Sequence, residues 1–351
     1  MSTTIERTTT EGPVGASPPA ASPRVRPARN RPALRALRSL GRAAGVALPV
    51  LLLTSLLTFA LGALADQEPA EIMLGEAATA DDVARLEHEL GLDRPVIVQY
   101  ASWLASAVRG DLGTSWFTGI PVSESIAQRL PVSLSIALFA LLIAIVLGAV
   151  FGILAAVRRG GVLDRAVTLV SATIATLPPF VLAIGLIVVF GVTFPALPTG
   201  GYVDPAIDTG AWLRSMVLPA VALAFDGAAD LARQLRTGLV GALGEGYIVG
   251  ARLRGLSPAR VLFVHALRNG VGPAVSALGL QLPRLIGGAI IAEAIFSIPG
   301  LGLLARDAAM RGDVPVVVGS LLVTVVMVLV ASLVVNVLLS VLRPETRRRS
   351  A

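Results

Sequence analysis

The segment Glu245–Pro273 reads EGYIVGARLRGLSPARVLFVHALRNGVGP and is a basic, glycine-punctuated stretch between two long apolar runs. Ser257 followed by Pro258 is a specific helix-start signal, because serine caps a helix N-terminus and proline suits the first helical position. Gly255 allows a turn that a residue with a β-carbon would resist. Together these residues predict two short helices that are joined by an elbow and anchored at both ends in apolar chain.

The composition of the chain is that of a membrane protein. Hydrophobic residues make up 54% of its 351 residues and charged residues only 15%, whereas soluble domains carry about 25% charged residues. The absence of cysteine and the presence of only two histidines exclude thiolate chemistry and the usual histidine-based metal sites. No catalytic residue, metal ligand or cofactor site is therefore predicted. The net charge of +6 is typical of basic loops beside a membrane and does not require a nucleic-acid partner.

Six apolar runs reach the length of about 20 residues that a helix needs to cross a bilayer. The chain is therefore predicted to be an all-α integral membrane protein with six transmembrane helices. Arginines gather in alternate connecting segments, starting with the N-terminal one, and the positive-inside rule then places both termini in the cytoplasm (N-in/C-in). The predicted spans are Gly45–Leu64, Pro131–Val157, Ala166–Phe194, Trp212–Leu235, Val271–Ile298 and Val314–Leu342.

The organisation that follows from these spans has five parts. The first part, residues 1–42, is rich in Pro, Ser, Thr and Arg. It cannot bury enough apolar surface to fold and is expected to lie beside the membrane lipid. Ala63-Leu64-Ala65 matches a signal-peptide cleavage pattern, but the apolar run before it is longer than the roughly 7–15 residues of such peptides, which favours an uncleaved anchor. The expected parts are a disordered basic cytoplasmic tail (1–42), a first transmembrane helix (43–65), an extracytoplasmic region with amphipathic helices (66–129), a five-helix transmembrane domain (130–342) and a basic cytoplasmic tail (343–351).

The expected extracytoplasmic region contains two amphipathic helix patterns. Thr79 can cap a helix with Asp82 at its third position, and a second pattern follows Pro95. The apolar stripe of the second pattern includes Tyr100 and Trp103. Such stripes are expected to pack against the protein's own spans or the membrane surface rather than to form a ligand site.

Two of the predicted spans carry residues that affect helix packing. Gly148-x-x-x-Gly152 lies in the second span and allows a neighbouring helix to approach closely. Pro178-Pro179 lies inside the third span, where neighbouring helices are expected to satisfy the carbonyls that the prolines leave free.

Asp226, Asp230 and Arg284 fall within apolar runs, where a charge costs about 2.5–3.5 kcal/mol at the helix centre and needs a partner or water. Arg233 lies one helical turn from Asp230 near the inner surface and is expected to pair with it. We hypothesise that Asp226 and Arg284 face a translocation pathway and bias which substrate charges pass. The alternative is a structural role between packed helices.

Several further motifs lie in a fixed order along the chain. Besides Tyr247–Ser257 and His265–Asn269 with Pro273, they are Glu89–Pro95 with Gln99-Tyr100, Arg109–Ser115, Pro121–Pro131, Leu154–Arg158, Gly279–Leu282, Gly287-Gly288, Glu293–Gly302 and Asp313–Pro315. Their order resembles that of the permease subunits of ABC importers, and more narrowly those of the dipeptide, oligopeptide and nickel transporters. The broader permease motif begins Glu-Ala-Ala, and Val249, Gly250 and Ala251 stand at these positions here. Loss of that glutamate is common in the peptide branch and favours it.

The resemblance implies a type I ABC importer permease fold in which residues 245–269, the coupling segment, dock into a groove on an ATP-hydrolysing subunit. In such a permease Ala251 and Gly255 hold the shape of the segment, while neighbouring side chains fill the groove. ATP hydrolysis is implied on a separate subunit, so the chain is not expected to be an enzyme. The sequence contains no G-x-x-x-x-G-K-[ST] loop, which agrees with this expectation. The residues implied for ATPase coupling are Tyr247, Ala251, Arg252, Arg254, Gly255, Leu256, Ser257 and Pro258.

The resemblance also implies partners in the bacterial inner (plasma) membrane and on both of its sides. They are a second homologous permease subunit, two cytoplasmic ATP-binding subunits and an extracytoplasmic substrate-binding protein. Six spans would form half of the pathway. The implied substrate is a peptide, with nickel or another small solute as the alternative. A secondary transporter would be expected to show inverted repeats and an intramembrane enzyme a nucleophile–base pair, and the sequence shows neither pattern.

Overall fold

The computed structural model describes residues 32–64, 69–75 and 77–342. The chain divides into two compact units, residues 1–42 and 43–351. The expected tail at 343–351, residues 1–31 of the tail expected at 1–42, and Ala65 of the cleavage pattern lie outside the described residues. Residues 32–42 of the expected N-terminal tail are helical and form the first part of α1 (Pro32–Leu64). The described part of the second unit is built from helices, with one isolated antiparallel bridge between Thr114 and Pro121.

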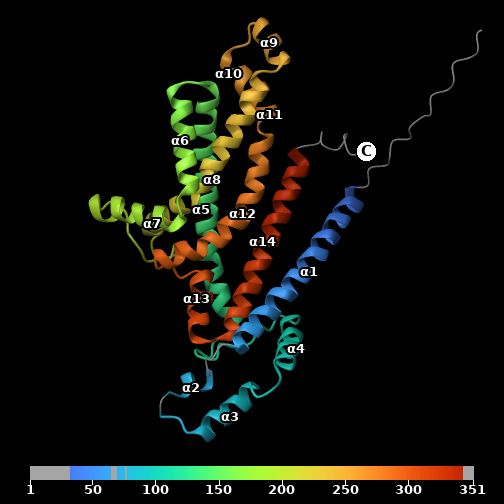
Figure 1. Cartoon of the computed structure of the whole chain (residues 1–351), viewed down its shortest axis with the longest axis vertical. Helices are drawn as coiled ribbons and strands as arrows, with labels where there is room; N and C mark the ends of the chain where they lie inside the picture. The colour runs from blue at the N-terminus through green and yellow to red at the C-terminus, as the bar shows by residue number, and fades with distance from the viewer. Residues whose placement is uncertain (1–31, 65–68, 76, 343–351) are drawn as a thin grey trace, which may run out of the picture. The chain divides into compact units, whose positions relative to one another are not determined.

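Five long helices dominate the described chain (Figure 1). By length and composition α5, α8, α12 and the described part of α14 could each cross a membrane, and α6 with α7 and η1 would make a fifth such element. The described apolar part of α1 covers Ala47–Gly62 and is shorter than these four. The count of six spans therefore stays a prediction. The bounds of the long helices are α1 Pro32–Leu64, α5 Val122–Val157, α8 Thr209–Leu243, α12 Gly272–Ile295 and α14 Val314–Leu342.

Helices α5 and α8 make the most extensive helix contact in the described chain, and glycine makes that contact close. A β-carbon on Gly148 would lie 2.7 Å from side-chain atoms of Leu231, and one on Gly152 would lie 2.9 Å from the carbonyl oxygen of Ala232. Both distances are shorter than atoms tolerate, so the two helices can pack at this spacing only because these residues lack side chains. The close packing predicted from Gly148-x-x-x-Gly152 is confirmed.

The third apolar run is broken. Helix α6 (Val162–Thr176) and the pair α7 (Pro179–Ile187) and η1 (Val188–Thr193) meet at an angle of 106°. The span predicted over Ala166–Phe194 is therefore broken at Leu177-Pro178. Leu177 has ψ 131° and Pro178 has ψ 140°, because each precedes a proline and the α-region is disfavoured before proline.

The predicted helix patterns of the region before α5 are both confirmed. They correspond to α3 (Ala80–Leu90) and α4 (Val96–Ala107), which follow the short α2 (Pro69–Leu74). Thr79 and Asp82 form a reciprocal capping box at the start of α3.

The apolar stripe of α4 packs against α1. Tyr100 is buried, its ring meets Phe59 edge-on at 5.9 Å between centroids, and its hydroxyl lies 2.9 Å from Oγ of Ser55. Because Phe59 and Ser55 belong to α1, this stripe packs against the helix that corresponds to the first predicted span.

A buried glutamate holds α5, α12 and α13 (Leu301–Arg311) together. Oε1 of Glu293 accepts a hydrogen bond of 2.5 Å from the Ser133 hydroxyl, and Oε2 accepts from the backbone N–H groups of Gly302 at 2.8 Å and Leu303 at 3.1 Å. The carboxylate thereby satisfies donors that the first turn of any helix leaves without a partner. This arrangement fixes where α13 begins.

Asp313 joins the loop before α5 to the start of α14. Its carboxylate accepts a 2.5 Å hydrogen bond from the Ser115 hydroxyl and a 3.4 Å bond from the backbone N–H of Trp116. Burial raises the pKa of Asp313, and the bond from Ser115 opposes that shift. Both residues belong to sequence motifs quoted above for the resemblance, and the structure gives those motifs a shared packing role.

Candidate functional site

The coupling segment adopts the two-helix form that its sequence predicts. Helix α9 (Gly246–Leu253) ends shortly before Gly255, which has φ +78°. Ser257 then caps the next helix by accepting from the N–H of Arg260, and Pro258 occupies the first helical position. In Figure 1, α9 and α10 (Pro258–Arg260) lie at the same end of the helix bundle as the turn between α5 and α6, and α13 lies toward the other end of the bundle.

The second helix of the segment differs from a regular α-helix. The chain is helical from Pro258 to Gly270, but Val261–Ala266 (η2) forms a π-helical turn between α10 and α11 (Leu267–Gly270). Single π-turns inside helices occur frequently at functional sites. The apolar spacing of the sequence predicts a helix here and carries no signal for the wider turn.

Buried side chains attach the coupling segment to the rest of the bundle. Ile248 and Ala251 of α9 are 0% and 1% exposed, and they join Leu239 of α8 in one apolar cluster with Val261 and Ala266. Asn269 in α11 donates a 2.9 Å hydrogen bond to the hydroxyl of Tyr247 in α9. The two helices of the segment are thus held to each other as well as to α8.

A glycine pair brings α11 and α8 into backbone contact. A β-carbon on Gly238 would lie 2.0 Å from the carbonyl oxygen of Gly270, and one on Gly270 would lie 2.8 Å from that of Gly238. Such contacts leave no room for a side chain, so α11, which ends at Gly270 directly after the coupling segment, packs tightly against α8.

The elbow itself projects from this attached base. Among the residues implied for ATPase coupling, Ala251 is buried and Leu256 is half-buried against the apolar cluster. The others are exposed, and Leu253 beside them is 83% exposed. No described atom outside its immediate surroundings lies within 4 Å of the position that a β-carbon on Gly255 would take. The exposed residues are Tyr247, Arg252, Arg254, Gly255, Ser257 and Pro258.

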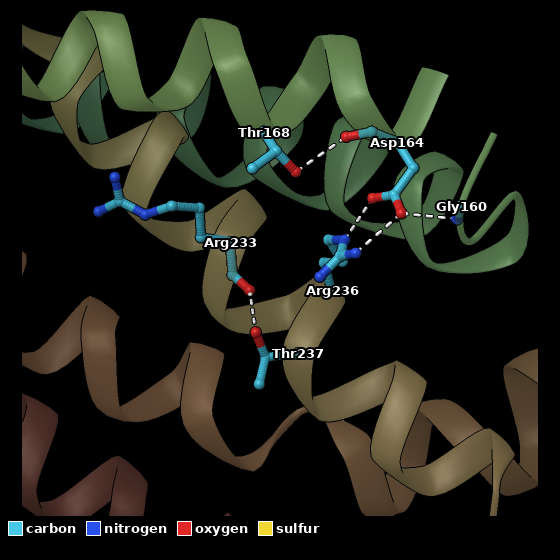
Figure 2. Close-up of polar contacts among 6 residues, drawn as sticks. All are labelled: Gly160, Asp164, Thr168, Arg233, Arg236 and Thr237. Carbon is cyan, nitrogen blue, oxygen red and sulfur yellow. Dashed lines mark hydrogen bonds and ion pairs between the residues drawn. The ribbon is translucent and has the colours of Figure 1, made fainter. Parts of the chain in front are cut away.

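A second polar element near this end joins α6 to α8 (Figure 2). Asp164, 3% exposed, accepts from Nε of Arg236, from Nη2 of Arg236 at 2.8 Å and from the backbone N–H of Gly160 at 2.8 Å. Asp164 lies in α6 and Arg236 in α8, 72 residues apart. No spacing rule links residues so distant, so the sequence gives no signal for this ion pair.

The expected pair of Asp230 and Arg233 is confirmed. Nη2 of Arg233 lies 3.1 Å from Oδ1 of Asp230 within α8, at the i,i+3 spacing. This pair satisfies one of the acidic residues of the fourth apolar run and leaves Asp226 to be explained.

Asp226 and Arg284 line one cavity of about 290 Å³, but they do not pair directly. The cavity lies where the elbow between α6 and α7 meets α8 and α12. Gln281 also lines it, although sequence reasoning did not single this residue out. The available signal was a polar side chain inside an otherwise apolar run. The lining residues are Ala175, Leu177, Pro179, Leu182, Ala222, Leu223, Asp226, Gln281, Arg284 and Leu285.

Comparisons with known proteins identify the family to which the chain is similar. A family model described as "Binding-protein-dependent transport system inner membrane component" matches residues 148–348. A second model, described as the N-terminal part of such a membrane component, matches residues 36–137. The first match covers more than half of the chain and includes the coupling segment.

Individual relatives match over most of their length. One from Brucella abortus (strain 2308), whose name assigns it to peptide transport system permeases, is 38% identical over 302 residues, which are 86% of this chain and 96% of the relative. The dipeptide transport system permease protein DppB of Escherichia coli (strain K12) is 35% identical over 332 residues, 88% of this chain and 98% of the relative. The di/tripeptide transport system permease protein DppB of Pseudomonas aeruginosa is 35% identical over 331 residues, with the same coverage of both chains.

A solved structure shows the same fold. A chain of the MetNI methionine ABC transporter, in an inward-facing conformation, superposes with a TM-score of 0.51 at 19% identity and covers 62% of this chain and 96% of its own. This similarity confirms the type I ABC importer permease fold expected from the resemblance. With the family match and the relatives, it shows that the chain belongs to the binding-protein-dependent transport system inner membrane components.

Proposed function

We propose that this chain is the membrane-spanning permease subunit of an ATP-driven importer that carries peptides across the bacterial plasma membrane. The relatives from Escherichia coli and Pseudomonas aeruginosa are named for dipeptide and di/tripeptide transport, which favours peptides over nickel or another small solute. The chain would span the membrane six times with both termini in the cytoplasm, and residues 130–342 would form its ABC transmembrane type-1 domain.

The coupling segment would dock into a groove on an ATP-hydrolysing subunit. The observation that carries this proposal is the exposed Gly255 elbow on a base buried through Ile248 and Ala251. A surface that transmits force needs side chains free to contact a partner and a base that moves as one body. Arg252, Arg254 and Ser257 would contact the ATPase, while Ala251 and the backbone at Gly255 would hold the shape.

Movement of the coupling segment would reach the membrane through α8. The contact of Gly238 with Gly270 ties the segment to α8, and the Asp164–Arg236 ion pair ties α8 to α6. Closure of the ATPases would therefore shift α6 and α8 together. Such a transition between two packed arrangements would open the pathway alternately to the two sides of the membrane.

The assembled importer would contain subunits that this chain does not supply. A second homologous permease would complete the pathway, two cytoplasmic ATP-binding subunits would hydrolyse ATP, and an extracytoplasmic substrate-binding protein would deliver the peptide. The intramembrane charges Asp226 and Arg284 would face the pathway, since both line the same cavity.

Purification and transport measurements test this proposal. The chain, produced with its neighbouring transporter subunits, is expected to co-purify with an ATPase and to support ATP-dependent peptide uptake in proteoliposomes when the binding protein is present. Uptake that continues without ATP hydrolysis, or a chain that associates with no ATPase, would contradict the proposal. The complex with the Gly255→Glu variant, which is expected to hydrolyse ATP without coupled uptake, serves as the matched control.

A further inference from the structure

The cavity beside the elbow of α6 and α7 contains three polar side chains without protein partners. Asp226, Gln281 and Arg284 form no hydrogen bond or ion pair with any described residue. Gln281 is 4% exposed, whereas Asp226 is half-buried and Arg284 is exposed. Charges within an apolar span need water or a ligand where no side chain pairs with them, so these groups are free to bind a ligand in the cavity.

The shape of the cavity depends on a glycine. A β-carbon on Gly227 in α8 would lie 2.6 Å from Nε2 of Gln281, so the Gln281 side chain packs this close to α8 because Gly227 has no side chain. Apolar residues such as Leu177, Leu182 and Leu285 form the rest of the wall. A mostly apolar pocket with a few convergent polar groups is the usual form of a small-molecule site.

The volume limits the ligand. At about 290 Å³ the cavity lies near the lower end of the roughly 300–1,000 Å³ common for small-molecule sites. A ligand of a few residues fits such a space, whereas a long peptide does not. The charges limit it further, because one carboxylate and one guanidinium face the same space.

These charges match a molecule that carries an ammonium group and a carboxylate. A guanidinium can bond a carboxylate through two parallel N–H groups, and a carboxylate accepts from an ammonium group. The amide of Gln281 can both donate and accept, as a peptide bond requires. A divalent cation such as nickel would meet one carboxylate and a nearby guanidinium, which repels it, and would lack the nitrogen ligands that nickel prefers.

We propose that Asp226, Gln281 and Arg284 form a binding site in the permease for a short peptide with free termini. Asp226 would take the ammonium group, Arg284 the carboxylate and Gln281 the amide between them. This inference rests on the proposed function and adds to it a selection step after the binding protein has released its cargo.

The test measures equilibrium binding of radiolabelled dialanine to the assembled permease–ATPase complex in lipid nanodiscs. The binding protein is left out, since it would otherwise select the peptide first. Saturable binding is expected, with strong competition by unlabelled dialanine and weak competition by N-acetyl-dialanine, dialanine amide and Ni²⁺. The blocked peptides each lack one terminal charge, so they report on the two ends of the site separately.

Variants assign each end to a residue. Arg284→Gln is expected to weaken dialanine binding about tenfold or more, as the loss of a hydrogen bond to a charged group predicts. The variant should also no longer bind dialanine more tightly than dialanine amide. Asp226→Asn is expected to bind dialanine no more tightly than N-acetyl-dialanine. Arg214→Gln removes an exposed arginine of α8 that does not line the cavity, and this matched control should bind like the parent.

Gln281→Met keeps the length of the side chain, adds no charge and tests the site if the charge variants do not assemble. It is expected to weaken dialanine and both blocked peptides alike. The inference is overturned if the parent shows no saturable binding, if terminal preferences survive in the variants, or if Ni²⁺ competes as strongly as dialanine. ATP-dependent dialanine uptake with the binding protein present separates the two proposals. If the parent complex takes up dialanine but shows no saturable binding, only the proposed binding site is contradicted. If the parent complex takes up no dialanine, the proposed function is contradicted.

Discussion

The side-chain amide of Asn269 donates a 2.9 Å hydrogen bond to the hydroxyl of Tyr247, 22 residues earlier in the chain. The bond joins α11 to α9 across the Gly255 elbow, so it closes the coupling segment into a loop with both ends held. The same amide also donates to the carbonyl of His265 at 3.2 Å. We therefore expect Tyr247 and Asn269 to position the elbow together.

Removing this bond is expected to loosen the elbow without unfolding the protein. Tyr247→Phe retains the ring and loses the hydroxyl, which costs about 0.5–1.5 kcal/mol for a typical hydrogen bond. ATP-dependent uptake should fall more than the ATPase rate of the complex. The double variant Tyr247→Phe with Asn269→Ala should lose little more uptake than either single variant. Fully additive losses of uptake in a double-mutant cycle would show that the two residues act independently.

Gly255→Glu is expected to leave membrane insertion intact and to uncouple uptake from ATP hydrolysis. Glutamate at φ +78° is strained by about 1–2 kcal/mol, and its side chain would occupy the exposed tip. Uptake and ATPase rate are measured on the same proteoliposomes.

Gly241→Glu is the matched control for that variant. Gly241 is exposed in α8 and also has open space around its β-carbon position, but its φ is not positive. It should retain coupled uptake. Undiminished uptake in Gly255→Glu would show that the elbow does not transmit force.

Local rules account for what the sequence predicted of this region. Ser257, Pro258 and Gly255 act on their own backbone, so their types alone specify a cap, a first turn and a positive φ. The break at Leu177-Pro178 is also local, but hydropathy concealed it. Hydropathy reports how apolar a run is and not the direction in which its backbone continues.

Contacts between distant segments could not be predicted in the same way. The Asp164–Arg236 ion pair and the cavity that Asp226, Gln281 and Arg284 line depend on how α6, α8 and α12 pack. Two charges within apolar runs indicated that polar groups gather somewhere in the membrane. Which face each helix presents was decided by glycines that permit close approach, and one sequence does not reveal the partner helix of each glycine.

The ion pair between α6 and α8 is expected to contribute strongly to stability. Arg236→Gln would leave the buried carboxylate of Asp164 without its cationic partner, and breaking buried pairs in this way typically costs about 3–5 kcal/mol. Asp164→Asn should cost less, because the Arg236 side chain is 30% exposed. Thermal unfolding of the purified complex in detergent ranks the variants.

Arg233→Gln is the control for the ion-pair variants. Its partner Asp230 lies one turn away in the same helix, and both side chains are partly exposed. Its contact with α6 is a long 3.5 Å hydrogen bond to the carbonyl of Ser171, so its loss should cost no more than about 1 kcal/mol. The expected order of melting temperatures is Arg233→Gln highest, then Asp164→Asn, then Arg236→Gln. Equal effects of all three would contradict a special role for the link between α6 and α8.

Gly238→Ala tests the backbone contact that joins the coupling segment to α8. The added methyl group would lie 2.0 Å from the carbonyl oxygen of Gly270, and overpacking of this kind typically costs about 1–3 kcal/mol. Because α11 must move away from α8, uptake should fall while the ATPase subunit still binds the exposed elbow. Gly241→Ala, three residues further along α8 with open space at its β-carbon position, should transport like the parent. If both variants transport equally well, force does not reach the membrane through this contact, and the buried cluster around Ile248 must carry it instead.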